Sequence, residues 1–397
     1  MTRREWATTT AAALGAASCA SSPPTEPGPA PPSGPLYLDL HIDTPSRMVR
    51  EQLDIGESNW YHSVDIQKMH DGGLNAGFFA ISTSARGNTP VQSVKNALDI
   101  ADVILRETAK HPEHLFIATN SADVLRAQRE GKIGVMLAVE GGHMIDSSLA
   151  VLRQFYRLGV RYMGLTHSGN TPWVGAAEYD DGPEGLTEFG REVVREMNRL
   201  GMMIDLSHAS DPAFYDVVET TTAPIINTHA CCRAVSDHPR NLTDDMLKKL
   251  AENGGTLGIA YYAAMLDDGF RAKGPQFAAF NKKKAAARAQ FADDPKKLSE
   301  QLWRIEQESI EAIGTIPLSR LVDHIEHCAT VAGIDHVSLG CDYDSIGLKL
   351  PEGIEDISKT PNLVAALKER GFSDEDVDKV LGRNALRVLQ ANEDNAS

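Results

Sequence analysis

The sequence has 397 residues, of which 42% are hydrophobic, so it can bury a large core, and its evenly spread apolar runs indicate one large domain. No repeat with the period of a solenoid or a propeller runs along it. The formal charge of −16 argues against a nucleic-acid partner, which needs a clustered positive surface, and favours a small polar or cationic substrate.

Residues 1–18 have the features of an export signal. Arg3 and Arg4 form a basic start, and the weakly apolar stretch 7–17 is too short to span a membrane. The arginine pair resembles a twin-arginine signal, which exports proteins already folded, and an ordinary Sec signal is the alternative. Either signal predicts a protein of the periplasm or cell envelope.

Cysteine usage gives two further predictions. Cys19 follows small residues that resemble a bacterial lipoprotein box, so it is predicted either to carry a lipid anchor or to be an unmodified cysteine of the signal peptide. Residues 19–35, rich in Pro, Ser and Gly, are predicted to form an extended tether. The adjacent Cys231 and Cys232 are predicted to be small buried residues, with soft metal ligation as the alternative.

Eight short runs rich in Val, Ile, Leu, Met or Ala are predicted to be strands. They are residues 37–43, 75–81, 133–140, 161–167, 202–208, 224–229, 256–261 and 336–342. Runs that are apolar on both faces are typical of a parallel sheet covered by helices, and residues 187–200 between two of them have helical periodicity. This alternation predicts an α/β fold, a (β/α)8 TIM barrel over residues 36–392.

Residues 267–313 differ from the rest of the barrel because they are dense in Lys, Ala, Gln and Glu. They are predicted to form exposed amphipathic helices inserted after the seventh strand, and a disordered loop is the alternative. Residues 393–397 are predicted to be a C-terminal tail.

Metal-binding side chains stand at the ends of several predicted strands, and such ends meet at one active site in a parallel barrel. His41 and Asp43 are two residues apart, so they point to the same face of the first strand. Glu140 has two oxygens with which to bridge two metals, although a surface Glu is the alternative. His208 and His229 end consecutive strands, which favours metal ligation over the structural role that is commoner for a single His.

Three other residues are candidates for the chemistry itself. His167 is either a third imidazole ligand or a substrate contact. Asp342 can take a proton from metal-bound water and pass it to a leaving amine, and Asp344 competes for that role. Arg240 follows the sixth strand, where it could hold a substrate carboxylate or simply be a solvated loop residue. Six other histidines are predicted to lie at the surface: His62, His70, His111, His114, His324 and His327.

Eight short segments together resemble the membrane (renal) dipeptidase family, peptidase family M19. They occur in the family's order: 39–45 (DLHIDTP), 139–143 (VEGGH), 165–170 (LTHSGN), 204–208 (IDLSH), 228–229 (TH), 238–242 (HPRNL), 340–344 (GCDYD) and 351–353 (PEG).

The resemblance implies a (β/α)8 barrel of the amidohydrolase type that holds two zinc ions. One zinc would be bound by His41 and Asp43 and the other by His208 and His229, with Glu140 bridging both. The resemblance also implies a homodimer.

The same resemblance implies roles for the remaining candidates. His167 corresponds to the histidine that contacts the scissile carbonyl or its oxyanion, Asp342 to the catalytic acid and base, and Arg240 to the anchor for the substrate's C-terminal carboxylate. The hypothesis is therefore hydrolysis of dipeptides, including those with a C-terminal D-residue, by a hydroxide that bridges the two metals.

Two rival functions are considered. Another binuclear amidohydrolase, such as a lactam or lactone hydrolase, often uses a carboxylated Lys as the bridge, whereas Glu140 stands in that role here. A non-catalytic exported lipoprotein that binds peptides would not need Asp342.

Overall fold

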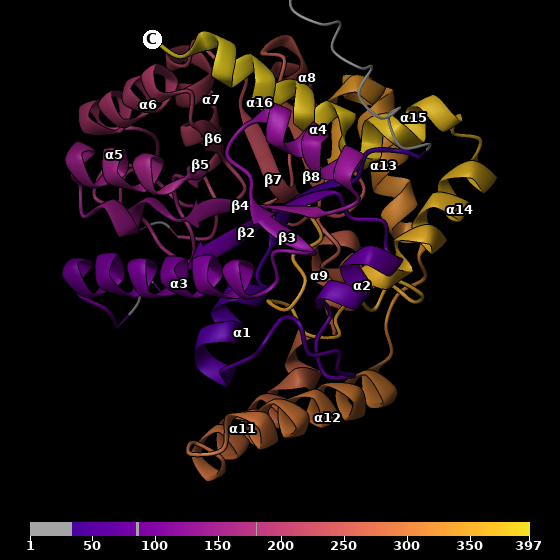
Figure 1. Ribbon diagram of the computed structural model, residues 1–397. Helices are drawn as coiled ribbons and strands as arrows, with labels where there is room; N and C mark the ends of the chain where they lie inside the picture. Colours follow the sequence, from indigo (N-terminus) through magenta and orange to yellow (C-terminus); the bar gives the residue numbers. More distant parts are fainter. Residues whose placement is uncertain (1–33, 85–86, 180) are drawn as a thin grey trace, which may run out of the picture. The chain divides into compact units, whose positions relative to one another are not determined.

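Eight parallel strands lie side by side in the computed structural model, which describes residues 34–84, 87–179 and 181–397 (Figure 1). Their order is β1-β2-β4-β5-β6-β7-β8-β9. These strands are β1 (Leu38–Ile42), β2 (Ala76–Ser82), β4 (Ile133–Glu140), β5 (Val160–Gly164), β6 (Met203–Asp205), β7 (Ile226–Ala230), β8 (Thr256–Ile259) and β9 (Val337–Leu339). Each predicted strand is present, and the order is that of a (β/α)8 TIM barrel.

The last strand returns to the first and nearly closes the barrel. Ile42 and Tyr343 form a parallel bridge just beyond the ends of the regular pairing. The Asp342 N–H donates to the His41 carbonyl at 3.0 Å, and the Asp43 N–H donates to the Tyr343 carbonyl at 3.1 Å. The seam between β9 and β1 is therefore held by the backbone of residues predicted to lie in the active site.

Several strands are shorter than the apolar runs that predicted them. His167, His208 and Asp342 each lie three residues beyond the last residue of β5, β6 and β9, respectively. The runs remain apolar there because the chain is still buried, but the backbone has already left the regular ladder. These three side chains therefore stand on loops above the barrel rather than on the strands themselves.

A ninth strand was not predicted. β3 (Leu115–Ile117) pairs in parallel with the start of β4, off the path of the barrel. It has only three residues, of which two are half-buried, so it has no hydrophobic pattern that would distinguish it from a loop.

Helices cover the outside of the barrel (Figure 1). Those up to the eighth strand are α1 (Thr44–Glu51), α2 (Ile66–Asp71), α3 (Pro90–Lys110), α4 (Ser121–Glu130), α5 (Leu149–Leu158), α6 (Glu188–Leu200), α7 (Asp211–Thr220) and α8 (Asp244–Glu252). Those that follow are α9 (Ala263–Leu266), α10 (Asp268–Arg271), α11 (Ala278–Gln290), α12 (Pro295–Ile313), α13 (Ser319–Ala332), α14 (Thr360–Arg370), α15 (Asp374–Asp378) and α16 (Asn384–Asn395).

Local sequence explains where these helices begin and end. The Thr187 hydroxyl accepts a hydrogen bond from the Gly190 N–H at the start of α6, and Gly201 ends that helix in the left-handed conformation with φ of 74°. A side chain at this φ would be strained, so glycine suits the turn into β6. The buried face of α6, which includes Val193, Val194 and Met197, packs against the barrel.

The segment between β8 and β9 carries helices α9 to α13, and α10, α11 and α12 are those of residues 267–313. α11 and α12 pack against each other, and α12 also contacts α1. In Figure 1 the pair lies away from the strands, next to α1. This position brings the pair to the side of the molecule where the first strand ends.

Two histidines that were predicted to lie at the surface are buried. His62 is 1% exposed and His324 is fully buried, whereas His70, His111, His114 and His327 are partly exposed. The His324 Nδ1 accepts from the Cys232 N–H at 3.1 Å, and its Nε2 donates to the Leu266 carbonyl at 3.0 Å. Backbone partners that sequence does not reveal are thus what allow this ring to be buried. Cys231 and Cys232 are buried and free, as predicted.

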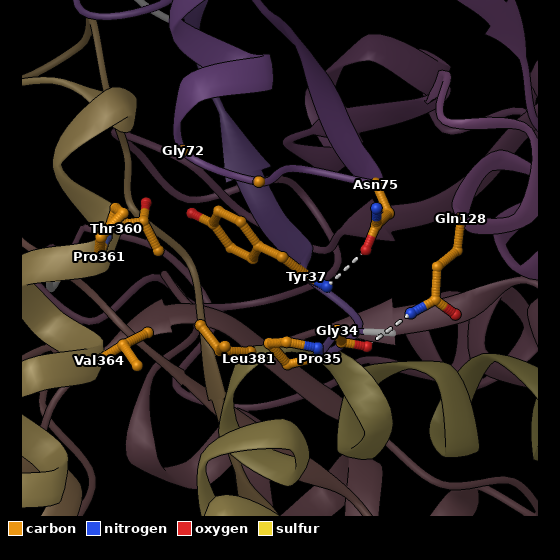
Figure 2. A pocket seen from close by; sticks show the side chains of 11 residues that line it. Gly34, Pro35, Tyr37, Gly72, Asn75, Gln128, Thr360, Pro361, Val364 and Leu381 are labelled. Atoms are coloured by element: carbon orange, nitrogen blue, oxygen red, sulfur yellow. Dashed lines mark hydrogen bonds between the residues drawn. The ribbon is translucent and has the colours of Figure 1, made fainter. Parts of the chain in front are cut away.

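The start of the barrel is less polar than its active end. A cavity of about 490 Å³ opens beside the start of β1, where Figure 2 shows Tyr37, Asn75 and Leu381 around it.

The predicted export signal, Cys19 and most of the tether lie outside the described residues. Among the described residues, no helix combines the length and the apolar character needed to cross a bilayer.

Candidate metal centre

Seven acidic and imidazole side chains converge at the C-terminal ends of the strands. In the part of the chain that the structure describes, their potential ligand atoms form three overlapping groups, each with all atoms within 4.8 Å of one another. The groups are His41, Glu140 and His229; Glu140, His167 and His208; and His41, Asp43 and Asp342. Residues predicted from six separate strands are thus collected in one place.

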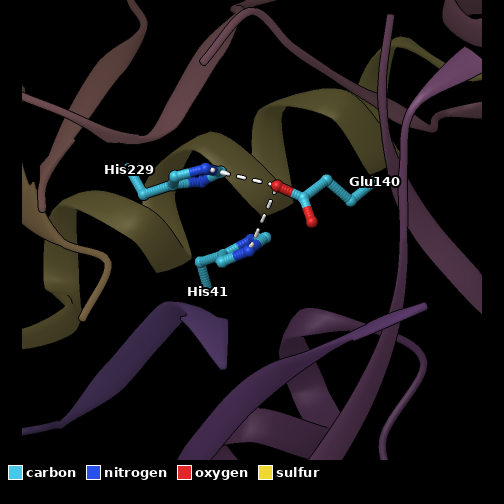
Figure 3. Close-up of side chains that lie close together, drawn as sticks. All are labelled: His41, Glu140 and His229. Carbon is cyan, nitrogen blue, oxygen red and sulfur yellow. Dashed lines mark ion pairs between the residues drawn. The ribbon is translucent and has the colours of Figure 1, made fainter. Parts of the chain in front are cut away.

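Glu140, the last residue of β4, lies at the centre of this cluster. Its Oε1 is 3.0 Å from His208 Nε2, 3.3 Å from His229 Nε2 and 3.6 Å from His41 Nε2. His167 Nε2 is 3.9 Å away from the same oxygen. Figure 3 shows two of these rings, His41 and His229, pointing at Glu140 from the same side.

The imidazole nitrogens also face one another. His208 Nε2 and His229 Nε2 are 3.0 Å apart, and the rings of His41 and His229 stack with centroids 3.9 Å apart. Two neutral rings that both present a lone pair at this distance repel each other unless a cation lies between them. The crowding therefore suits a metal ion better than a network of hydrogen bonds.

Four buried polar atoms in the cluster have no hydrogen-bond partner among the described residues. They are His41 Nε2, Asp43 Oδ1, Glu140 Oε2 and His167 Nδ1. An unpaired buried donor or acceptor costs about 1–3 kcal/mol, so four in one place are expected only where something else completes their bonding. Imidazole nitrogens and carboxylate oxygens are the ligands of zinc and similar ions, so these residues fit a metal centre.

The protonation states also suit metal binding. Burial lowers the pKa of His41 and His208 well below the ordinary value, and it lowers the pKa of His229 to about 3. Burial acts in the opposite direction on Glu140, but the surrounding imidazoles outweigh it and hold the pKa of that carboxyl well below its usual range. Neutral rings and an ionised carboxylate are the forms that bind metal ions.

Buried hydroxyl groups orient two of the rings. His41 Nδ1 is 2.7 Å from the Tyr162 hydroxyl, and His229 Nδ1 is 2.9 Å from the Thr228 hydroxyl, which in turn is 3.0 Å from the Ser207 hydroxyl. Such partners fix the ring so that Nε2 faces the centre. Tyr162 was not predicted as part of the site, because its only signal in the sequence is a hydroxyl inside an otherwise apolar strand.

Asp342 lies on the side of the cluster formed by His41 and Asp43. Its Oδ1 is 3.9 Å from His41 Nε2, and its backbone has a positive φ of 56°. Gly340 precedes it because a Cβ there would lie 1.7 Å from the Thr228 carbonyl oxygen. Burial, followed by the negative charge of Glu140, raises the pKa of Asp342 to about 8.

Asp344 points away from the cluster. Its Oδ1 accepts from Arg47 Nη1 and the Ser63 N–H, both at 3.0 Å, and its Oδ2 accepts from the Thr44 hydroxyl at 2.7 Å. Burial would raise the pKa of this carboxyl, but the Arg47 guanidinium offsets it and the pKa is lowered. Both oxygens of Asp344 are therefore occupied by other partners.

Arg240 lies next to His208 and His229. Its Nε donates to the Ser207 carbonyl at 3.2 Å and its Nη2 donates to the His229 carbonyl at 3.3 Å. These bonds fix a half-buried guanidinium beside the metal-binding side chains. Its positive charge adds to the effect of burial in lowering the pKa of His208.

Known proteins resemble this chain along nearly its whole length. The family model described as Membrane dipeptidase (Peptidase family M19) matches residues 35–397. A protein of Schizosaccharomyces pombe that is named an uncharacterized dipeptidase is 33% identical over 376 residues, which cover 90% of this chain and 80% of that protein.

Solved structures share the same fold. The metallopeptidase of family M19 called dipeptidase AC is 25% identical with a TM-score of 0.74, over 91% of this chain and 99% of that chain. A metallopeptidase from Rhodobacter sphaeroides, bound to a phosphinate mimic of the dipeptide L-Ala-D-Ala, is 25% identical with a TM-score of 0.72, over 91% of this chain and 100% of that chain. Each likeness therefore covers about nine-tenths of this chain.

Proposed function

We propose that this chain, which belongs to the membrane dipeptidase family, peptidase family M19, binds two zinc ions around Glu140. As a member of that family it is a metal-dependent enzyme that hydrolyses dipeptides, and the two ions would serve this reaction. The observation that carries this proposal is the position of Glu140. One of its oxygens faces the imidazoles, while the other is buried without a partner, so the carboxylate has an oxygen for each of two ions.

The ligands divide between the two sides of that carboxylate. His41 and Asp43, which have unpartnered atoms facing each other at 3.9 Å, would hold one ion with Glu140. His208 and His229, whose Nε2 atoms are 3.0 Å apart, would hold the other. When bound, the ions would supply a strong nucleophile from water at neutral pH and would polarise the peptide carbonyl.

Three residues around the ligands would then act on the substrate. Arg240 binds the C-terminal carboxylate through its guanidinium. The residue after the scissile bond must therefore carry a free carboxylate. His167, whose side chain is 22% exposed, can reach the carbonyl oxygen of the scissile bond. Asp342 takes the proton of the attacking water and delivers it to the nitrogen of the leaving amine.

Asp342 is preferred to Asp344 for this proton transfer on geometric grounds. The Asp342 carboxylate lies within 3.9 Å of His41 Nε2, inside the cluster. The oxygens of Asp344 are occupied by Arg47, Ser63 and Thr44 and do not face the metal ligands.

Metal removal tests the proposal. Exhaustive chelation, verified by elemental analysis, should abolish hydrolysis of L-Ala-L-Ala, and added zinc should restore it at about two ions per chain. Restoration at one ion per chain would contradict the binuclear site. Activity that survives verified metal removal would contradict the mechanism as a whole.

The proposed substrates include dipeptides with a C-terminal D-residue. The support is the Rhodobacter sphaeroides relative, which was crystallised with a mimic of L-Ala-D-Ala. Comparable kcat/KM values for L-Ala-D-Ala and L-Ala-L-Ala would support this extension, and no hydrolysis of the D-containing dipeptide would contradict it.

The proposed location is the periplasm or cell envelope, with a lipid on Cys19 as the anchor. The support comes from the basic start, the short apolar stretch and the small residues before Cys19. The Cys19→Ser variant should move from the membrane fraction to the soluble periplasmic fraction. An unchanged distribution would contradict the lipid anchor.

A further inference from the structure

A polar cavity of about 260 Å³ lies beside the candidate metal centre, between α1, the helix pair α11–α12 and the loop after β9. Its lining includes Ser345, Arg288, Lys349 and Trp303. None of these residues belongs to the cluster around Glu140. The cavity is therefore a separate compartment, built largely by the helical insertion.

Ser345 connects this cavity to the metal centre. It lies three residues after Asp342 in the loop that follows β9, and it lines the cavity. The cavity is therefore next to the loop that carries the proposed proton-transfer residue.

The charges around the cavity do not balance. Four cations and three carboxylates line it: Arg47, Lys284, Arg288, Lys349, Glu51, Glu306 and Asp344. Arg47 is paired with Glu51 at 2.9 Å and with Asp344 at 3.0 Å, and Lys284 is paired with Glu306. Two cations, Arg288 and Lys349, remain without a carboxylate partner within 4.0 Å in the described part of the chain.

The surroundings of Lys349 favour binding of a carboxylate. Its Nζ is 3.5 Å from the Ile346 carbonyl and lies 5.9 Å and 5.7 Å from the ring centroids of Tyr262 and Phe277. Burial lowers the pKa of this ammonium group, which an anion beside it would reverse. A half-buried cation between two aromatic rings gains from a carboxylate because water screens the pair only partly.

The direction in which a dipeptide lies follows from the position of Arg240. With the C-terminal carboxylate on Arg240, beside His208 and His229, the scissile bond lies over the centre. The N-terminal residue then extends away from Arg240, towards the group formed by His41, Asp43 and Asp342, whose loop also carries Ser345. Its side chain is the part of the substrate nearest the cavity.

We propose that this cavity receives the side chain of the N-terminal residue of the dipeptide, and that Arg288 and Lys349 make a carboxylate the preferred group there. The proposal rests on the proposed function and specifies its substrate class as dipeptides that begin with Glu or Asp. The competing occupant is a cationic side chain that pairs with Glu306, whose Oε2 is buried and unpartnered. Glu306 is already neutralised by Lys284, so the net positive charge favours the anion.

Four dipeptides test the preference with the zinc-loaded enzyme. L-Glu-L-Ala and L-Gln-L-Ala differ only in charge, L-Lys-L-Ala reports the competing occupant, and L-Ala-L-Ala reports the basic activity. The kcat/KM for L-Glu-L-Ala should exceed that for L-Gln-L-Ala by about tenfold or more, as expected for a charge-assisted hydrogen bond. The ratio should fall as salt is raised, because the cavity is open to solvent.

Two variants locate the effect. Arg288→Gln and Lys349→Met should each lower the ratio of kcat/KM for L-Glu-L-Ala over L-Gln-L-Ala, and the double variant should bring it close to one. Lys283→Gln is the matched control, because Lys283 lies on the same helix and is paired with Glu308 at 2.7 Å outside the cavity. That variant should leave the ratio unchanged.

The outcomes separate the two proposals. Hydrolysis of L-Ala-L-Ala with a ratio near one, or with L-Lys-L-Ala as the better substrate, overturns the assignment of the cavity and leaves the dipeptidase function intact. A preference for Glu that survives the double variant also overturns it. Failure to hydrolyse any of the four dipeptides would overturn the proposed function and the cavity assignment together.

Discussion

Asp342 and Asp344 lie two residues apart in one loop, yet their surroundings give the two carboxyl groups different properties. Both have a positive φ, of 56° and 72°, which is uncommon for a residue with a side chain. Asp342 faces the imidazoles, and burial raises its pKa to about 8. Asp344 is locked to Arg47, which holds its pKa low. The local backbone thus places one carboxyl group at the metal centre and uses the other to anchor the loop.

Substitution of each residue by Asn should separate these roles. Asp342→Asn should lower kcat by about 10²- to 10⁴-fold, because it removes proton transfer, while metal content stays near that of the wild type. Asp344→Asn should instead lower the free energy of unfolding by about 3 kcal/mol, because it removes one carboxylate partner from the buried Arg47. Steady-state kinetics, elemental analysis and urea unfolding measure the three quantities. A larger kcat loss in Asp344→Asn than in Asp342→Asn would show that the two roles are reversed.

At the scale of elements, helix α13 is hydrogen-bonded to two segments near the C-terminal ends of the strands. His324 on this helix accepts from the Cys232 N–H, just after β7, and donates to the Leu266 carbonyl at the end of α9. Both bonds require a neutral ring with its proton on Nε2. Burial accordingly lowers the pKa of His324 to about 4.

This buried ring should make the protein sensitive to acid. The unfolded state binds the proton below a pKa of about 6.5 and the folded state only below about 4, so stability is full above 6.5 and falls as the pH drops toward 4. At pH 5 the loss from this ring alone is about 2 kcal/mol. His324→Gln should therefore lose less stability than the wild type between pH 7 and pH 5 in urea unfolding. An identical loss in the two proteins would contradict the assignment.

Strands were predicted correctly from the sequence where a continuous apolar run was sufficient to define them. The run that became β4 is apolar on both faces and all eight of its residues are buried, so its predicted and observed bounds agree. The ends of β5, β6 and β9 were placed too late, because burial continues after hydrogen-bonded pairing stops. His62 and His324 were wrongly placed at the surface, since their burial depends on contacts far away in sequence.

At the scale of the whole molecule, the cluster around Glu140 joins segments from most of the barrel. Its proposed ligands come from β1 and the residue after it, from the end of β4, from the loop after β6 and from β7. A metal ion bound there would connect these strands and would also give the unpaired buried polar atoms a bonding partner. The folded state alone presents this arrangement, so metal binding and folding are coupled.

Metal removal should consequently destabilise the entire fold. Zinc at a free concentration 100 times its Kd stabilises the folded state by about 2.7 kcal/mol for each site. Thermal unfolding should show a Tm that is several degrees lower after verified chelation and that rises with added zinc. A Tm unchanged by verified metal removal would contradict tight binding to the folded state.

Much of the candidate site could be predicted because each residue ends or follows a strand. The chain order of His41, Glu140, His208, His229 and Asp342 is enough to bring them together once the barrel is recognised. The supporting residues could not be found in this way. Tyr162 looks like an ordinary strand residue, and the cavity beside Ser345 depends on how α11 and α12 pack against α1, which no local pattern specifies.

The seam between β9 and β1 also determines when, during synthesis of the chain, the active site can be completed. Asp342 binds the backbone of His41, which lies about 300 residues earlier in the chain. At about 5–20 residues per second on the ribosome, the first metal ligands are made roughly 15 to 60 seconds before the residue proposed to transfer the proton. The first candidate ligands are therefore synthesised long before the barrel can close. Hydrolytic activity should arise only after Asp342 has been synthesised and has paired with β1.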